Sequence, residues 1–99
     1  MPKIFKYFGY FLYIYVNDHL PLHVHAVIQG RETKFILEYN NGILTVVNKA
    51  IKGKTALNAT KITEMRKFVR KYADKIKEQW EAIHYYKKQI TCIEVKRKV

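Results

Sequence analysis

Short runs of alternating apolar and polar residues fill the first half of the chain, and this two-residue period is typical of β-strands. Many residues in these runs are aromatic or β-branched, which favours extended backbone. The pattern predicts strands over residues 3–8, 11–16, 23–28, 33–39 and 43–47. Turn-forming residues separate them, namely Gly9-Tyr10, Asn17-Asp18, Gln29-Gly30 and Asn40-Asn41-Gly42.

From residue 60 onward the apolar residues recur every three or four positions, which predicts one face of an amphipathic helix. The residues on this face are Ile62, Met65, Val69, Tyr72, Ile76, Trp80 and Ile83. The helix is expected to run from about Thr60 to about Tyr86, either unbroken or with one break near Asp74. Thr60 is a suitable N-cap, and Glu64 suits the first turn. Residues 89–95 predict a final strand that leads into a basic tail.

This order of elements predicts an α+β fold in which helix and sheet form separate layers. We expect a mostly antiparallel sheet of five or six strands, packed by one long C-terminal amphipathic helix with at most one break, and a final short strand. Residues 1–99 are expected to form a single domain. Aromatic residues of the first two strands should pack beneath Tyr72 and Trp80, and Cys92 should be a buried thiol in the last strand.

Composition excludes several classes of protein. Hydrophobic residues make up 48% of the 99 residues, which is typical of a globular domain and not of a disordered chain. The longest apolar runs fall short of the ~18 residues that suggest a membrane-spanning helix. The apolar N-terminus lacks the small-residue cleavage site of a signal peptide. A single cysteine excludes an internal disulfide, so we expect a cytoplasmic protein without membrane association.

Charge indicates the kind of partner. The chain has 19 Lys and Arg against 8 Asp and Glu, for a net charge of +11, and fourteen of the basic residues follow residue 50. A field of this sign attracts polyanions, which include RNA, DNA and acidic proteins. The candidate contacts to nucleic acid or to such a partner are Lys49, Lys52, Lys54, Lys67, Arg70, Lys71 and Lys75. The helical members of this set equally fit a solvated helix face with charge pairs three or four residues apart.

Three of the four histidines lie in the segment NDHLPLHVH, residues 17–25. His23 and His25 should project from one side of a strand, roughly 6.5–7 Å apart along it. Histidines in this arrangement suit either acid–base chemistry or a metal ion. A turn that enters a strand, with histidines bonded to neighbours, also explains the pattern. The candidate catalytic residues are His19, His23 and His25, and the candidate metal ligands are Asp18, His19, His23 and His25.

The chain resembles DUF4160, a family of small bacterial proteins of unknown function. The family pattern opens Met-Pro-x-Ile, continues through a Gly-Tyr hairpin and centres on N-D-H-x-P-x-H-V-H. This chain matches it at Met1, Pro2, Ile4, Gly9, Tyr10, Asn17, Asp18, His19, Pro21, His23, Val24, His25, Lys34, Phe35, Leu37, Glu38 and Trp80. The resemblance covers about residues 1–86. Leu22 replaces a proline usual in the family, and residues 87–99 extend past its normal end.

The resemblance implies a role without implying a reaction. Members of this family are often encoded beside a second small protein, in pairs that look like toxin–antitoxin modules. A component of this type, which interacts with nucleic acid or with an acidic partner, is the first hypothesis. The alternatives are a ribonuclease-like toxin that uses His23 and His25 as acid and base, and a protein that binds a divalent metal through Asp18, His19, His23 and His25. The sequence requires no cofactor, and it leaves open whether the protein is an enzyme.

Overall fold

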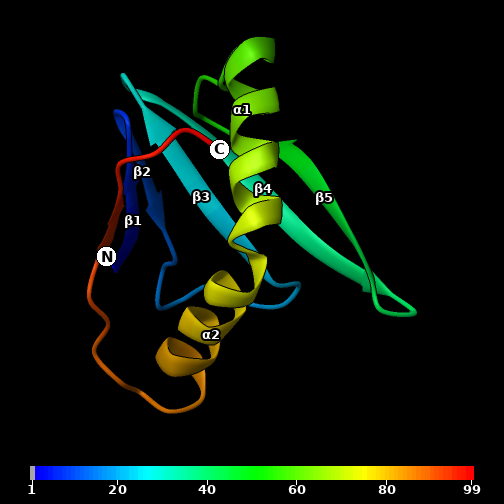
Figure 1. Ribbon diagram of the computed structural model, residues 1–99, viewed down its shortest axis with the longest axis vertical. Coiled ribbons are helices and arrows are strands. Elements are labelled where there is room, and N and C mark those ends of the chain that lie inside the picture. Colours follow the sequence, from blue (N-terminus) through cyan, green and yellow to red (C-terminus); the bar gives the residue numbers. More distant parts are fainter. Residues whose placement is uncertain (1) are drawn as a thin grey trace.

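A computed structural model describes residues 2–99 as a six-stranded sheet with two helices, and Met1 lies outside this description (Figure 1). The strands lie side by side in the order β5-β4-β3-β2-β1-β6. All neighbouring strands are antiparallel except β1 and β6, which are parallel. The predicted α+β class and the mostly antiparallel sheet are therefore confirmed. The strands are β1 Lys3–Tyr7, β2 Tyr10–Tyr13, β3 His23–Ile28, β4 Arg31–Asn40, β5 Ile43–Ala50 and β6 Ile93–Val95.

Three two-residue turns connect β1 to β2, β3 to β4 and β4 to β5. Each ends in glycine, and both residues of each turn have positive φ, as at Asn41 (52°) and Gly42 (81°). This is the turn geometry whose twist matches antiparallel strands, and glycine adopts it without steric cost. The predicted turn Gly9-Tyr10 is displaced by one residue, because Tyr10 already belongs to β2 and Phe8 takes its place in the turn.

The core lies between one face of the sheet and the helices α1 (Ala59–Lys71) and α2 (Ala73–His84). Phe68 of α1 is fully buried there, with its ring 5.2 Å from Phe5 and 4.5 Å from Tyr7. Phe5 pairs with Leu12, which pairs with Ala26, so these side chains face the helices together. The predicted aromatic core is confirmed for Phe5, Tyr7 and Tyr10, whereas Phe8 is 47% exposed in its turn.

The prediction of one long helix is wrong, because the helical segment divides at Tyr72, and the alternative with one break near Asp74 comes close. Tyr72 has ψ 21°, outside the α-helical range, and its ring lies 4.7 Å from Phe68 and 5.3 Å from Phe5. The axis changes direction there, so that α2 covers the end of the sheet where β3 begins (Figure 1). The apolar stripe continues across the break, which is why periodicity alone did not locate it.

The ends of the helical segment and of the chain also differ from the prediction. Asn58, and not Thr60, is the N-cap, since its side chain accepts a hydrogen bond from the Lys61 N–H. The last strand spans only Ile93–Val95, because the preceding residues return from the end of α2 to the edge of β1 (Figure 1). Cys92 precedes that strand and is exposed, so the predicted buried thiol is wrong. Within residues 2–99 the two helices are too short and polar to cross a bilayer.

Replacement of Phe68 by alanine should destabilise the fold by about 3–5 kcal/mol, because it leaves a cavity beneath the ring cluster. Urea denaturation followed by circular dichroism measures this change in the free energy of unfolding. Lys67→Ala, at the exposed neighbouring position, should cost about 0.5 kcal/mol or less. Equal effects of the two substitutions would show that Phe68 does not anchor the core.

Candidate metal centre

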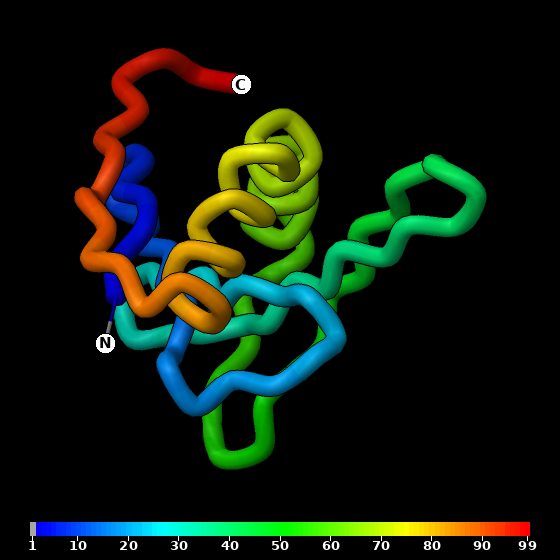
Figure 2. Tube along the Cα trace, turned by 90° about the horizontal axis from the view of Figure 1, so that it is seen from below, coloured from blue at the N-terminus to red at the C-terminus, as the bar shows by residue number. Residues whose placement is uncertain are grey.

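The connection between β2 and β3, residues 14–22, lies over the sheet face that α1 leaves free. Tyr13 of β2 pairs with His25 of β3, and both alternate with the core residues Leu12 and Ala26. Their side chains therefore point away from the core face of the sheet. In Figure 2 this connection lies on the opposite side of the strands from α1.

His23 and His25 project from β3 on the same side, as their spacing predicts. Val24 between them is fully buried toward the core. The two imidazole rings are 5.2 Å apart and only 6% and 8% exposed. Trp80 of α2 packs against His23 at 5.3 Å, and Tyr15 packs edge-on against His25 at 4.4 Å. The pair is therefore shielded from bulk water.

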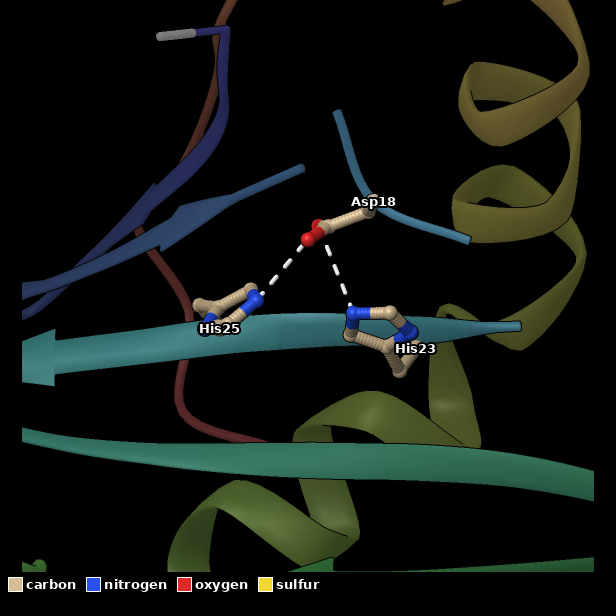
Figure 3. Close-up of side chains that lie close together, drawn as sticks. All are labelled: Asp18, His23 and His25. Atoms are coloured by element: carbon tan, nitrogen blue, oxygen red, sulfur yellow. Dashed lines mark ion pairs between the residues drawn. The ribbon is translucent and has the colours of Figure 1, made fainter. Parts of the chain in front are cut away.

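Asp18 points from the connection toward both rings (Figure 3). Its Oδ2 atom lies 3.3 Å from Nε2 of His23 and 3.4 Å from Nε2 of His25. The Tyr15 N–H donates to the same oxygen at 3.0 Å, and the Asp18 N–H donates to the Tyr15 carbonyl at 2.9 Å. The turn thus fixes the carboxylate, and one atom from each of the three side chains falls in a group no more than 4.8 Å across.

The hydrogen bonds of the other ring nitrogens determine which nitrogen carries a proton. Nδ1 of His23 lies 2.7 Å from the Pro21 carbonyl, which can only accept, so this Nδ1 is the donor. Nδ1 of His25 lies 3.0 Å from Oε2 of Glu32, a carboxylate oxygen that also accepts. When both rings are neutral, each Nε2 then carries a lone pair directed at the Asp18 carboxylate. Three acceptors converge, and Nε2 of His25 is buried without a hydrogen-bond partner.

Glu32 of β4 and Tyr15 form the outer part of the site. The Tyr15 hydroxyl donates to Oε2 of Glu32 at 3.3 Å. Burial, together with the Glu32 charge, raises the pKa of Tyr15 to about 12, so Tyr15 remains a neutral donor at physiological pH. The contact of Glu32 with Nδ1 of His25 is of the kind that orients metal-binding imidazoles in many proteins.

Glu32 was not among the predicted site residues, because the fourth strand was predicted to begin at residue 33 and in fact begins at Arg31. The signal was present in the turn Gln29-Gly30. A two-residue turn there pairs Ile28 with Arg31 and Val27 with Glu32, on the face that His25 occupies. Strand register, and not the residue pattern of either strand alone, therefore identifies the partner of His25.

Burial lowers the pKa of His25 below its ordinary value of 6.5, although the nearby Asp18 charge opposes this shift. The neutral imidazole is the form that binds metals.

Asp18 also lines a surface pocket of about 450 Å³, together with His19, Leu20, Trp80, His84 and Tyr85. This pocket gives the cluster an opening to solvent.

The structure does not bring His19 into the cluster. Its side chain is exposed at the pocket, and it is absent from the group formed by Asp18, His23 and His25. The turn carries His19 outward because Asp18 itself folds back onto Tyr15. His84, which the sequence analysis left aside, lines the same pocket and stacks on Trp80 at 4.1 Å.

The basic residues named as candidate contacts lie on two sides of the sheet. Asn48 of β5 contacts Arg66 of α1, so its neighbour Lys49 points to the opposite face, the one that carries His25. Lys67 and Lys71 lie on the exposed face of α1. The sheet therefore separates Lys49 from the helical lysines.

The remaining predicted contacts are engaged locally or lie in a turn. Arg70 donates to the Leu44 carbonyl at 3.1 Å, and Lys75 pairs with Glu78 at 3.2 Å. Lys52 and Lys54 lie in the turn after β5, where Lys54 comes within 3.9 Å of Glu32. Its contact with Glu32 places Lys54 near the histidine cluster.

Comparison with known proteins gives a match to one family model, described as "Domain of unknown function (DUF4160)", over residues 9–81. This range includes Asp18, His23, His25 and Glu32. No curated protein and no solved structure matches the chain. The comparisons therefore carry no assigned activity.

The stability of the metal-free protein should fall as the pH drops below about 6.5, because unfolded His25 then binds a proton that the folded form resists. Above this pH both forms of His25 are neutral, and its contribution is constant. Urea denaturation in the presence of a chelator, from pH 8 to pH 5, measures the slope. His25→Gln should flatten it, and an unchanged slope in this variant would contradict the assignment.

Proposed function

The chain belongs to the DUF4160 family, and we propose that this protein binds one divalent transition-metal ion through Asp18, His23 and His25. The observation that carries this proposal is the convergence of two imidazole lone pairs on one carboxylate oxygen. While both rings are neutral, their lone pairs and the carboxylate repel one another, and a cation between them removes this repulsion. A metal ion satisfies all three at once, and it supplies the missing partner of Nε2 of His25.

The two distances from Asp18 to the histidines fit a tetrahedral ion. Bonds of about 2.0–2.1 Å from zinc to nitrogen and oxygen imply ligand atoms about 3.3–3.4 Å apart in a tetrahedron. The Asp18 oxygen is 3.3 Å and 3.4 Å from the two Nε2 atoms. Two imidazoles and one carboxylate also suit other first-row divalent ions, Fe²⁺ among them. Zinc is the first ion to test because the spacing matches it.

Three protein ligands leave a further coordination position, which is typical of catalytic and not of structural zinc sites. The pocket beside Asp18 supports access of a small molecule to that position. Glu32 and the Pro21 carbonyl support the proposal further, since each fixes the ring whose Nδ1 it accepts from. A divalent ion bound in this way would act as a Lewis acid or would lower the pKa of a bound water.

The same geometry favours a metal over a metal-free pair of acid and base. A ribonuclease-like mechanism through His23 and His25 needs a ring nitrogen that reaches the substrate. The Nδ1 atoms contact Pro21 and Glu32, and both Nε2 atoms face Asp18. All four nitrogens are therefore directed inward.

Zinc titrated into tag-free, metal-depleted protein should bind with a stoichiometry of one. Asp18→Asn should weaken binding by about a hundredfold or more, since it removes a charged ligand, and Glu32→Gln should weaken it by about 10–100-fold. Isothermal titration calorimetry measures the affinities. His19→Gln is the matched control, because it removes a neighbouring imidazole outside the cluster and should leave the affinity unchanged. Equal affinities of Asp18→Asn and His19→Gln would overturn the proposal.

A second candidate function is nucleic-acid binding, as in the toxin–antitoxin-type component that the family resemblance implies. The observation that favours it is a net charge of +11 with few internal counter-charges. In residues 2–99, the lysine and arginine side chains that form ion pairs are those of Lys54 and Lys75. The other lysines and arginines of these residues have no acidic partner within the protein, so they can attract an external polyanion, and an acidic protein is the competing partner.

Binding of a fluorescein-labelled oligonucleotide should be strong at low salt and should weaken steeply as salt increases. Each phosphate contact to a single strand contributes about −0.7 to the slope of log affinity against log salt. Fluorescence anisotropy over a salt series measures this slope. Affinity that is independent of salt would contradict electrostatic binding of nucleic acid.

A further inference from the structure

A row of side chains crosses four strands on the sheet face that carries the histidines. Tyr13 of β2 pairs with His25 of β3, His25 with Lys34 of β4, and Lys34 with Lys49 of β5. Directly paired residues lie on one face, and neighbouring strands are about 4.8 Å apart. The row therefore leads from an aromatic ring through the metal centre to two adjacent lysines.

The two lysines lack a counter-charge within the protein. Lys34 is half-buried and Lys49 is exposed, and within residues 2–99 neither forms an ion pair. Like charges directly opposite each other on neighbouring strands are destabilising. An anion bound between the two amines would remove this repulsion.

The face around these lysines is uncovered. Residues 14–22 lie on this side of the strands (Figure 2), where Asp18 contacts His23 and His25. On β5, Ile43 and Val47 alternate with core-facing residues on the same side as Lys49, and they are 69% and 37% exposed. An extended ligand can therefore lie across β4 and β5, up to the part of β3 where the connection covers His25.

We infer that a single strand of nucleic acid binds across this face, with backbone phosphates on Lys34 and Lys49 and with a phosphodiester beside the metal centre. Lysine amines bind phosphates as point charges. At the other end of the row Tyr13 stacks with Tyr15 at 6.2 Å and an interplanar angle of 10°, which offers an aromatic platform for a base. An acidic peptide would match the lysines and would leave this pair unused.

The inference rests on the proposed metal site, and it names the substrate class of that site. It also differs from the sequence-based prediction, which grouped Lys49 with basic residues of the helix and did not include Lys34. The two alternatives involve different lysine pairs of equal charge. Lys34 and Lys49 lie on the sheet face, and Lys67 and Lys71 lie on α1.

The test compares Lys34→Gln/Lys49→Gln with Lys67→Gln/Lys71→Gln, two double variants of identical net charge. Binding of a short fluorescein-labelled oligouridylate to the zinc-loaded proteins is followed by anisotropy over a salt series. The sheet variant should lose about tenfold or more in affinity, and its salt slope should become shallower by about 1.4, as expected for two lost phosphate contacts. The helix variant should change by about twofold or less. Lys49→Gln alone, at an exposed position, should lose about threefold in affinity for the oligouridylate. This single variant replaces the double variant in the test if the double variant folds poorly.

Several outcomes would overturn the inference. Equal losses in the two double variants would show that bulk charge, and not the row, binds the strand. A larger loss in the helix variant would place the strand on α1. Binding of polyglutamate that depends on Lys34 and Lys49, without binding of the oligonucleotide, would identify an acidic protein as the partner.

Zinc titration of the same variants separates this inference from the proposed function. The sheet variant should bind zinc as the unaltered protein does, because neither lysine is a ligand. If zinc binds and the lysine substitutions leave strand binding unchanged, only the inference fails. If the unaltered protein binds no zinc, the metal centre fails, and so does the placement of a phosphodiester beside it.

Discussion

The alternation of side chains along β3 links the fold to the site. Val24 and Ala26 fill the core beneath the helices, while His23 and His25 point to the other face. A slip of one residue in the pairing of β3 would bury the histidines in the core and expose the aliphatic residues. The strand is held against such a slip by pairing on both sides and by the tight turn at Gly30. The geometry of the metal centre is therefore a consequence of the hydrophobic core.

Around the histidines, each contact fixes the orientation of one ring or of the Asp18 carboxylate. The Pro21 carbonyl and Glu32 set the tautomer of the two rings, and the Tyr15 N–H fixes the Asp18 carboxylate. The result is a preorganised set of three acceptors, which is unfavourable without a cation and favourable with one. Lys34 and Lys49 also repel each other, but there the charges are positive. Both imbalances lie on the same sheet face, and a cation would relieve the first whereas an anion would relieve the second.

The sequence predicted the elements well and their spatial relations less well. Periodicity identified β3 and the apolar stripe, and alternation predicted that His23 and His25 share a face. The break at Tyr72 is set by packing on Phe5, a contact between distant residues that leaves no local signal. The role of Glu32 and the row through Lys34 depend on strand register, and the outward position of His19 depends on how Asp18 folds back. Residues in turns were therefore the least predictable part of the site.

Trp80 gives the metal centre a built-in optical reporter. It is the single tryptophan of the chain, and its indole lies between His23, at 5.3 Å, and His84, at 4.1 Å. The indole also lines the pocket that opens beside Asp18. Its emission therefore originates at the site alone, so intrinsic fluorescence can follow occupancy of the cluster and the docking of α2 without any label.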